Sequence, residues 1–465
     1  MNARPNIIYF VAHDVGRHLG CYHIPVTTPC LDAFAAEAVR FENAFCNATA
    51  CTPSRICAMT GLYAHSSGGV GLAHMGWPLA NNVPTIVDYF NTAGYETIHS
   101  GMEHERHPGL NRYQVDLQKH WVHFDVRRAV DDALAYLARR DRTRPFYLNI
   151  GSQEPHASTW HKAEAVHGGI VPPEDVYVPP YVPDTLAIRH QLGRFQAALR
   201  YMDTQFGRLL EGLRALGHDH DSIIVFTTDH GIAGPRSKGT LYDRGVEIAL
   251  MIRLPDAARA GSVCDHLIQN IDLVPSLLEA AGIPVPAGLH GRSFWPVLSG
   301  GKYIAHEAIF IERNFHGEPR MHGVRDEYED RYDPVRAIRT TEFHYIKYFA
   351  PDVKCRPWLP WEVAGHAVPL GTPLEFCVPP PREPRAEVEL YHVRHDPQEF
   401  INVAGRPEFR AVEAALAQRL QEWLVTTNDF VLRGEVPKRY EAPGWGPWEG
   451  MPADEEEARA AGWFS

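Results

Sequence analysis

The sequence lacks any apolar run long enough to span a membrane. A membrane helix needs ~20 consecutive, mainly apolar residues, and no stretch of the 465-residue chain comes near that length. The chain also passes from Met1–Pro5 directly into the apolar segment Ile7–Val11, which leaves no room for a secretory signal peptide. We therefore expect a cytoplasmic protein that does not bind a membrane.

Positive charge is also in short supply. Lys and Arg number 45 against 57 Asp and Glu, which gives a formal net charge of −12. This balance argues against nucleic acid or an anionic membrane surface as a partner, because both require a broad positive surface. A small anionic substrate would therefore have to be drawn in by a local positive site.

The cysteines show no disulfide framework and no paired metal-site spacing. They stand at positions 21, 30, 46, 51, 57, 264, 355 and 377. Without an export signal, free thiols in a reducing compartment are the better interpretation. With 45% hydrophobic and 22% charged residues, the composition is that of a globular enzyme, and the length suits one large domain plus a smaller one.

Short apolar runs alternate with amphipathic stretches, which is typical of an α/β fold with a mostly parallel sheet between helices. The predicted strands are 6–11, 95–98, 145–150 and 222–226, and the predicted helices are 29–39, 189–216 and 272–281. Past residue 305 the pattern predicts a hairpin over 335–349, a strand over 389–391 and a helix over 409–424. We predict an α/β domain over 1–305, an antiparallel sheet plus helix over 306–432, and an irregular tail over 433–465.

Each of the four predicted strands delivers Asp or His just past its carboxyl end. These residues are His13, Asp14, His104, His156, Asp229 and His230. Any one of them alone would be read as a solvated loop residue. Because ligands of open α/β sheets bind outside the carboxyl ends of the strands, the shared pattern favours one common site.

The pentapeptide Cys51-Thr52-Pro53-Ser54-Arg55 has the features of a helix start. Proline is tolerated at the first helical position, because its missing N–H would have no partner there. Cys51 and Arg55 are four residues apart and share a helix face, so both can address one ligand. The positive end of the helix dipole favours an anion at that place.

Residues 51–61 (CTPSRICAMTG) resemble the signature of the sulfatase family, in which the cysteine is oxidised to a formylglycine aldehyde. Other segments resemble the same family in the expected order: Pro5–Asp14 and 228–231 its metal motifs, 238–242 its Lys-x-x-Leu-Tyr segment, and 389–402 its C-terminal Glu-Leu-Tyr stretch. The run 179–185 and the helix after it look most like heparan N-sulfatase (sulfamidase)-type members. The resemblance implies an alkaline-phosphatase-like fold.

The resemblance also implies a mechanism. Hydrated formylglycine at Cys51 would offer two hydroxyls, one to attack sulfur and one to eject sulfate afterwards. Asp14, Asp229 and His230, together with the residue at position 51, would bind a divalent metal. The carboxylates favour Ca²⁺ first, with Mg²⁺ next, while an imidazole ligand favours Mn²⁺ or Zn²⁺. Maturation would need a formylglycine-generating enzyme as a partner.

Further roles follow from the same resemblance. Arg55 would neutralise the nucleophile, Lys238 and His156 would bind sulfate oxygens, and His104 would protonate the leaving group. The chain departs from the family at His13, which replaces a metal-binding Asp and either ligates the metal or packs behind the site.

A second departure is Met102, which stands where the family has a lysine that contacts sulfate. Either Arg17 or Arg106 supplies the missing charge, or the substrate is not a simple sulfate monoester.

Three functions compete at this point. The leading one is hydrolysis of a sulfate monoester or sulfamate on a sugar or small aryl compound. The second is a phosphonate monoester hydrolase or phosphodiesterase of the same superfamily, and the third is a non-catalytic anion-binding relative. Specificity would lie in 66–78, 160–180 and the proline-rich insertion 350–384, and the Trp-rich tail suggests a homodimer.

Overall fold

The core of the protein is an eight-stranded sheet in which every strand except β7 runs in the same direction. The computed structural model describes residues 4–105, 112–117, 125–182, 184–234, 236–315, 332–353 and 385–438. In spatial order the strands are β4 (Val115–Asp116), β3 (Glu96–Gly101), β5 (Phe146–Gly151), β1 (Asn6–Ala12), β6 (Ser222–Thr228), β7 (Leu250–Arg253), β2 (Val39–Phe45) and β8 (Val263–Gln269). The predicted α/β class with a mostly parallel sheet is confirmed.

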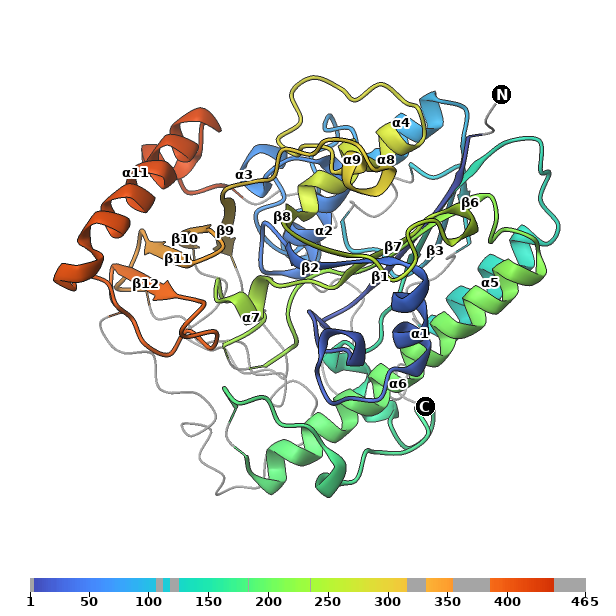
Figure 1. The fold of residues 1–465 in the computed structure, drawn as a ribbon, viewed down its shortest axis with the longest axis horizontal. Coiled ribbons are helices and arrows are strands. Elements are labelled where there is room, and N and C mark those ends of the chain that lie inside the picture. The colour runs from blue at the N-terminus through green and yellow to red at the C-terminus, as the bar shows by residue number, and fades with distance from the viewer. Residues whose placement is uncertain are drawn as a thin grey trace.

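The two faces of this sheet build two separate cores (Figure 1). Because side chains alternate along a strand, Ile7 and Tyr9 of β1 enter one core, while Ile8 and Phe10 enter the other. The first face is covered by α2 (Cys51–Thr60), α4 (Ile86–Thr92), α8 (Leu273–Ala280) and α9 (Trp295–Ser299). The second is covered by α1 (Pro29–Glu37), α5 (Val126–Leu137) and α6 (Leu186–Ala215).

Several predicted boundaries need correction. The helix predicted over 29–39 ends at Glu37, and Val39 already begins β2. The helix predicted over 272–281 is α8, preceded by a 3₁₀ turn at Asn270–Asp272. The strands β2, β4, β7 and β8 of this sheet were not predicted.

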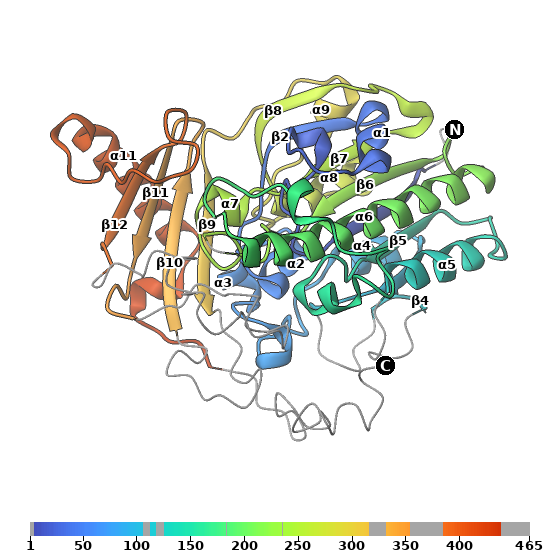
Figure 2. The same ribbon diagram turned by 90° about the horizontal axis from the view of Figure 1, so that it is seen from below.

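A second, antiparallel sheet stands beside the first (Figure 2). Its order is β12 (Val388–His392), β11 (Phe343–Tyr348), β10 (Tyr332–Arg339) and β9 (Ile309–Phe315). The hairpin predicted over 335–349 corresponds to β10 and β11, and the predicted last helix is α11 (Arg410–Thr426), which packs on this sheet through Leu420 and Trp423. Residues 354–384 of the insertion and 439–465 of the tail lie outside the described residues, and the domain boundaries stay predictions.

Two smaller helices complete the described elements, α3 (Ala64–Ser67) and α7 (Asp243–Val246). Within the described ranges, no helix combines the length and apolarity needed to cross a bilayer. The six cysteines in those ranges are free thiols, and Cys355 and Cys377 lie outside them.

Buried ion pairs fasten the second sheet to its surroundings. Arg336 of β10 is fully buried and binds Asp429 through Nε and Nη2 at 2.6 and 3.0 Å, with Glu312 of β9 at 3.8 Å. Arg339 at the end of β10 reaches the larger unit, where its guanidinium binds Asp243 of α7 at 2.8 and 2.9 Å. Since a buried charge without a partner is costly, these pairs fix how the second sheet is seated.

We expect Asp429→Asn to destabilise the protein by about 3 kcal/mol, because among the described residues it leaves the buried Arg336 charge with neutral hydrogen-bond acceptors and one carboxylate, that of Glu312 at 3.8 Å. Urea unfolding followed by circular dichroism measures this loss. The matched control is Glu435→Gln. Glu435 pairs with Arg433 in solvent, and an exposed ion pair contributes little to the free energy of unfolding. Equal unfolding midpoints for the two variants would contradict the expectation.

His344 makes stability depend on pH. Burial alone would lower its pKa, but the neighbouring Glu399 and Asp243 carboxylates raise the pKa of His344 from 6.5 to about 9. A raised pKa in the folded state gives stability that is complete below pH 6.5 and is lost as the pH rises through 9, up to about 3 kcal/mol. We expect His344→Gln to flatten the fall of the melting temperature over this window. The pKa of His13 is also raised from 6.5 to about 9. The His344→Gln protein is therefore compared with the parent protein, which has the same His13 contribution.

Candidate active site

Two buried aspartates meet at the carboxyl edge of the large sheet. β1 and β6 pair in parallel with Ala12 opposite Thr228, so Asp14 and Asp229 leave adjacent strands together. The Asp14 backbone N–H donates to Asp229 Oδ1 at 2.9 Å, and Asp14 adopts a left-handed conformation with φ of 56°. A non-glycine residue rarely takes this conformation, and such strain is concentrated at functional sites.

Three more side chains of types that can ligate a metal lie beside the two aspartates. The ligand atoms of His13, Asp14, Cys51, Asp229 and His230 all lie within 4.8 Å of one another, and all five residues are buried. His230 Nε2 lies 3.4 Å from both Asp14 Oδ1 and Cys51 Sγ. The structure thus brings together the whole predicted metal set, and His13 faces into it, with Nδ1 at 2.7 Å from Asp14 Oδ1.

This donor set fits a divalent cation. His230 Nδ1 lies 2.9 Å from the Gly231 carbonyl oxygen and donates to it, which leaves the lone pair of Nε2 directed into the cluster, as in metal-ligating histidines. The carboxylates of Asp14 and Asp229 provide hard oxygen ligands, and the imidazoles broaden the choice to transition metals.

Cationic side chains compensate the buried carboxylates. Lys238 Nζ donates to both oxygens of Asp14 at 2.9 Å, and Arg55 Nε donates to Asp229 Oδ2 at 3.2 Å. Burial alone would raise the pKa of Asp14, but the charge of Lys238 brings that pKa well below its usual range. Lys238 and Arg55 are therefore in the site, and their contact with sulfate stays a prediction.

Cys51 is the first residue of α2, and its side chain is directed into the cluster from a helix that is buried along its whole length. Pro53 is the third helical residue rather than the first, which corrects the prediction. The position is still in the first turn, where a backbone N–H has no helical partner. Burial alone would raise the pKa of the Cys51 thiol, but Lys238 and His13 lower it well below 9.

Two residues to which sequence analysis gave no role, Ser54 and Asn270, hold α2 next to the segment that carries Asp229. The Ser54 hydroxyl donates to the Asp229 carbonyl oxygen, and Asn270 Nδ2 donates to the Ser54 carbonyl at 2.9 Å. Nothing in the sequence links these residues, because Asn270 is 216 positions from Ser54. Together they determine where Cys51 lies.

The two remaining predicted histidines also reach the cluster. The Ser158 backbone N–H donates to His156 Nδ1 at 3.2 Å, which places the ring proton on Nε2, 3.8 Å from Asp14 Oδ2. His104 lies beyond β3 with its ring centre 6.1 Å from that of His13. Its carbonyl accepts a hydrogen bond from the Thr52 hydroxyl at 2.7 Å, so His104 is tied to the first turn of α2.

Arg17 does not replace the lysine that is missing at Met102. Its guanidinium binds the Glu42 carbonyl at 2.8 Å and Glu247 Oε1 at 3.0 Å, which overturns its proposed role as a compensating cation. Arg106 lies outside the described residues. Met102 is itself buried.

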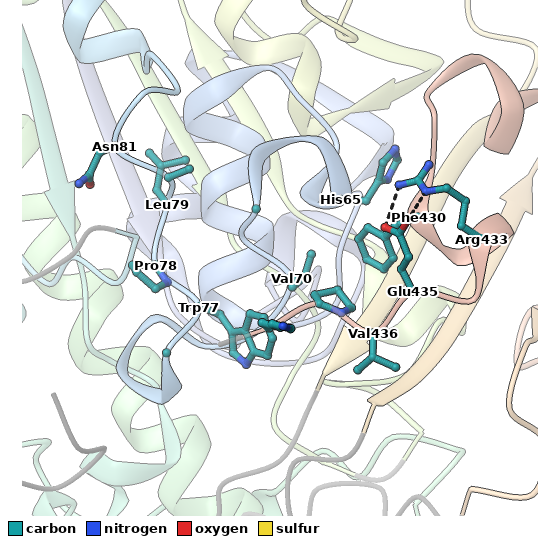
Figure 3. A pocket seen from close by; sticks show the side chains of 15 residues that line it. His65, Val70, Trp77, Pro78, Leu79, Asn81, Phe430, Arg433, Glu435 and Val436 are labelled. Carbon is teal, nitrogen blue, oxygen red and sulfur yellow. Dashed lines mark hydrogen bonds and ion pairs between the residues drawn. The ribbon is translucent and has the colours of Figure 1, made fainter. Parts of the chain in front are cut away.

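A cavity of about 830 Å³ lies between the loop after α3 and the segment before residue 439. Figure 3 shows Val70, Trp77 and Leu79 on one side and Phe430 and Arg433 on the other. Val70 and Trp77 also belong to the apolar cluster that includes Cys51. Part of the predicted specificity segment 66–78 therefore forms this wall, although its role in specificity stays a prediction.

A mostly parallel sheet between helices, with this carboxylate and histidine cluster at its carboxyl edge, is the arrangement that the resemblance to hydrolases of the alkaline-phosphatase-like fold implies. A family model described as sulfatase matches residues 5–283, and one described as N-sulphoglucosamine sulphohydrolase, C-terminal, matches residues 231–355. The first match covers more than half of the sequence. The chain belongs to the sulfatase family, and the predicted enzyme class is confirmed.

Known proteins resemble the chain over most of its length. Human N-sulphoglucosamine sulphohydrolase is 27% identical over 92% of this chain and 91% of its own. An ulvan-active sulfatase of Formosa agariphila is 25% identical over 92% of this chain and 76% of its own.

Solved structures share the fold. One in complex with its substrate D-glucosamine-2-N,6-O-disulfate superposes with a TM-score of 0.70 at 19% identity, covering 92% of this chain and 99% of that one. The phosphonate monoester hydrolase of Agrobacterium radiobacter superposes with a TM-score of 0.67 at 19% identity, covering 92% and 97%.

We expect a divalent cation to stabilise the metal-stripped protein by about 2.7 kcal/mol when added at 100 times its Kd. Asp229→Asn should abolish this gain, because it removes one of the two carboxylates. Asp203→Asn is the matched control, since Asp203 is equally buried but caps α1 on the far face of the sheet. Thermal unfolding of each protein with and without Ca²⁺, Mg²⁺, Mn²⁺ or Zn²⁺ measures the gain, and an unchanged gain in Asp229→Asn would refute the site.

Proposed function

We propose that the protein is a sulfohydrolase that removes sulfate from a sulfated amino sugar, as a sulfamate or a sulfate ester, with formylglycine at position 51 and a divalent cation. The observation that carries this proposal is the position of Cys51, buried at the start of α2 with Sγ 3.4 Å from His230 Nε2 inside the ligand cluster. The sulfamate is favoured by the C-terminal family match and by the human relative.

Two groups would bring the reactive chemistry. Cys51, once oxidised and hydrated, would supply two hydroxyls on one carbon, so that sulfuryl transfer and release of sulfate become two easier steps. A cation bound by Asp14, Asp229, His230 and His13 would supply positive charge next to the sulfate oxygens.

The remaining steps belong to the side chains of the chain itself. Arg55 and Lys238 hold the carboxylates and add positive charge where an anionic substrate must enter. His156 directs Nε2–H into the cluster and can donate it to a sulfate oxygen. His104 remains the proposed proton donor to the leaving group. Because the cluster is buried, these charges act in a medium of low dielectric constant.

A phosphonate monoester hydrolase is the second candidate. The observation in its favour is Met102, which stands where the family resemblance implies a lysine, combined with Arg17, whose guanidinium binds Glu42 and Glu247. A less charged anion would suit such a site. The complete ligand cluster counts against a non-catalytic relative. Maturation by a formylglycine-generating enzyme, a cytoplasmic location and a homodimer remain part of the proposal.

We expect protein co-expressed with a formylglycine-generating enzyme to hydrolyse N-sulfoglucosamine faster than an aryl sulfate or an aryl phosphonate in one metal-replete buffer. Cys51→Ala should reduce the rate more than about 1,000-fold, as loss of a nucleophile does. Cys57→Ala is the matched control, because Cys57 is a buried cysteine of the same helix and lies outside the cluster.

Each outcome of these rate measurements has a clear meaning. If the aryl sulfate reacts fastest, the substrate is a sulfate ester rather than a sulfamate. If the aryl phosphonate reacts fastest, the protein is the second candidate, a phosphonate monoester hydrolase. Equal rates for Cys51→Ala and Cys57→Ala would remove the nucleophile from the mechanism.

A further inference from the structure

The backbone of Gly239, the residue after Lys238, is held at both its N–H and its carbonyl. The Gly239 N–H donates to the Thr49 carbonyl oxygen at 3.0 Å, and the Gly239 carbonyl accepts a hydrogen bond from Arg313 Nη1 at 2.6 Å. Thr49 lies two positions before Cys51. Together with the bond from the Lys238 N–H to the Ile232 carbonyl at 3.1 Å, these two bonds hold the Lys238 backbone near the start of α2.

Arg313 reaches this peptide from the second sheet. It lies on β9, is only 8% exposed, and forms an ion pair with Asp333 of β10. Asp333 also binds Arg385, with Oδ2–Nη1 at 2.9 Å and Oδ1–Nη2 at 2.7 Å. Because Asp333 binds two arginines, the Arg313 guanidinium is fixed while its Nη1 is directed at the Gly239 carbonyl.

Lys238 needs such a support. Its ammonium is carried on a flexible four-carbon chain, yet Nζ lies 2.9 Å from both oxygens of Asp14. Because Nζ contacts both oxygens, any shift of the Lys238 backbone has to be taken up by the side chain or by these two contacts. A displacement of 1 Å in an active site can reduce the rate by about 100-fold.

We propose that Arg313 is a positioning residue for Lys238, acting through the Gly239 peptide, and that Asp333 and Arg385 hold Arg313 in place. The described hydrogen bonds of the Arg313 side chain go to Gly239 and Asp333, so Arg313 acts on the reaction through Lys238. The inference rests on the proposed function in one respect, namely that Lys238 contributes to binding or turnover of sulfate.

A double-mutant cycle tests this inference. Arg313→Gln should lower kcat/KM by between about 10- and 100-fold, but by no more than about twofold in the Lys238→Ala background, because coupled residues are not additive. Arg313→Lys, which keeps the charge and a donor, should recover part of the loss. Arg253→Gln is the matched control. Arg253 is 6% exposed and pairs with Glu37, and it lies opposite the start of β6, away from the carboxyl edge that carries the site.

A second arm does not depend on turnover. Affinity for inorganic sulfate, measured by calorimetry on the metal-loaded protein, should fall in Arg313→Gln and should not fall further when Lys238→Ala is already present. If the parent protein hydrolyses no sulfated substrate but sulfate affinity follows this pattern, the proposed function fails and the positioning role stands.

The positioning role would be overturned if Arg313→Gln lowered kcat/KM by the same factor in the parent protein and in the Lys238→Ala protein. It would also be overturned if Arg313→Gln lowered kcat/KM no more than Arg253→Gln does. Should Arg313→Gln not fold, Arg385→Gln takes its place in both arms with the same expected pattern and a smaller effect, because Arg385 acts one step further away.

Discussion

The repulsion between two buried carboxylates is the constraint on which the rest of the site depends. Asp14 and Asp229 lie side by side because their strands are neighbours, and neither can remain ionised there without positive charge nearby. That charge comes from Arg55 on α2 and from Lys238 on the loop after β6. The strand order places the two carboxylates together. The positions of α2 and of the loop that carries Lys238 place positive charge beside them.

The site was predictable from the sequence because parallel strands bring their carboxyl ends to one edge. β1, β5 and β6 are continuous apolar runs, so the positions of His13, His156 and Asp229 followed from the pattern. What the pattern could not predict is which group each charge would contact. Lys238 binds Asp14, and Arg17 turns away to Glu42 and Glu247, since such pairs join residues far apart in sequence.

The missed strands fail the same pattern for physical reasons. β9, which was also not predicted, carries three buried polar residues in succession, Glu312, Arg313 and Asn314. Its sequence therefore does not show the pattern of an apolar strand. Its charged side chains pair with Asp333 and Arg336 of β10, and these contacts form only when the chain is folded. β7 is four residues long, too short for periodicity to be recognised.

The burial of α2 has a consequence for when the protein can be matured. Cys51 is 2% exposed, and its helix is held by residues that follow much later, such as Asn270, which donates to the Ser54 carbonyl from 216 positions further along the chain. At about 5–20 residues per second, roughly 10 to 40 s of synthesis separate the two. Any enzyme that oxidises Cys51 must reach it within that interval or while the chain is otherwise open. A polypeptide that folds with its thiol intact would be closed to a modifying enzyme supplied afterwards.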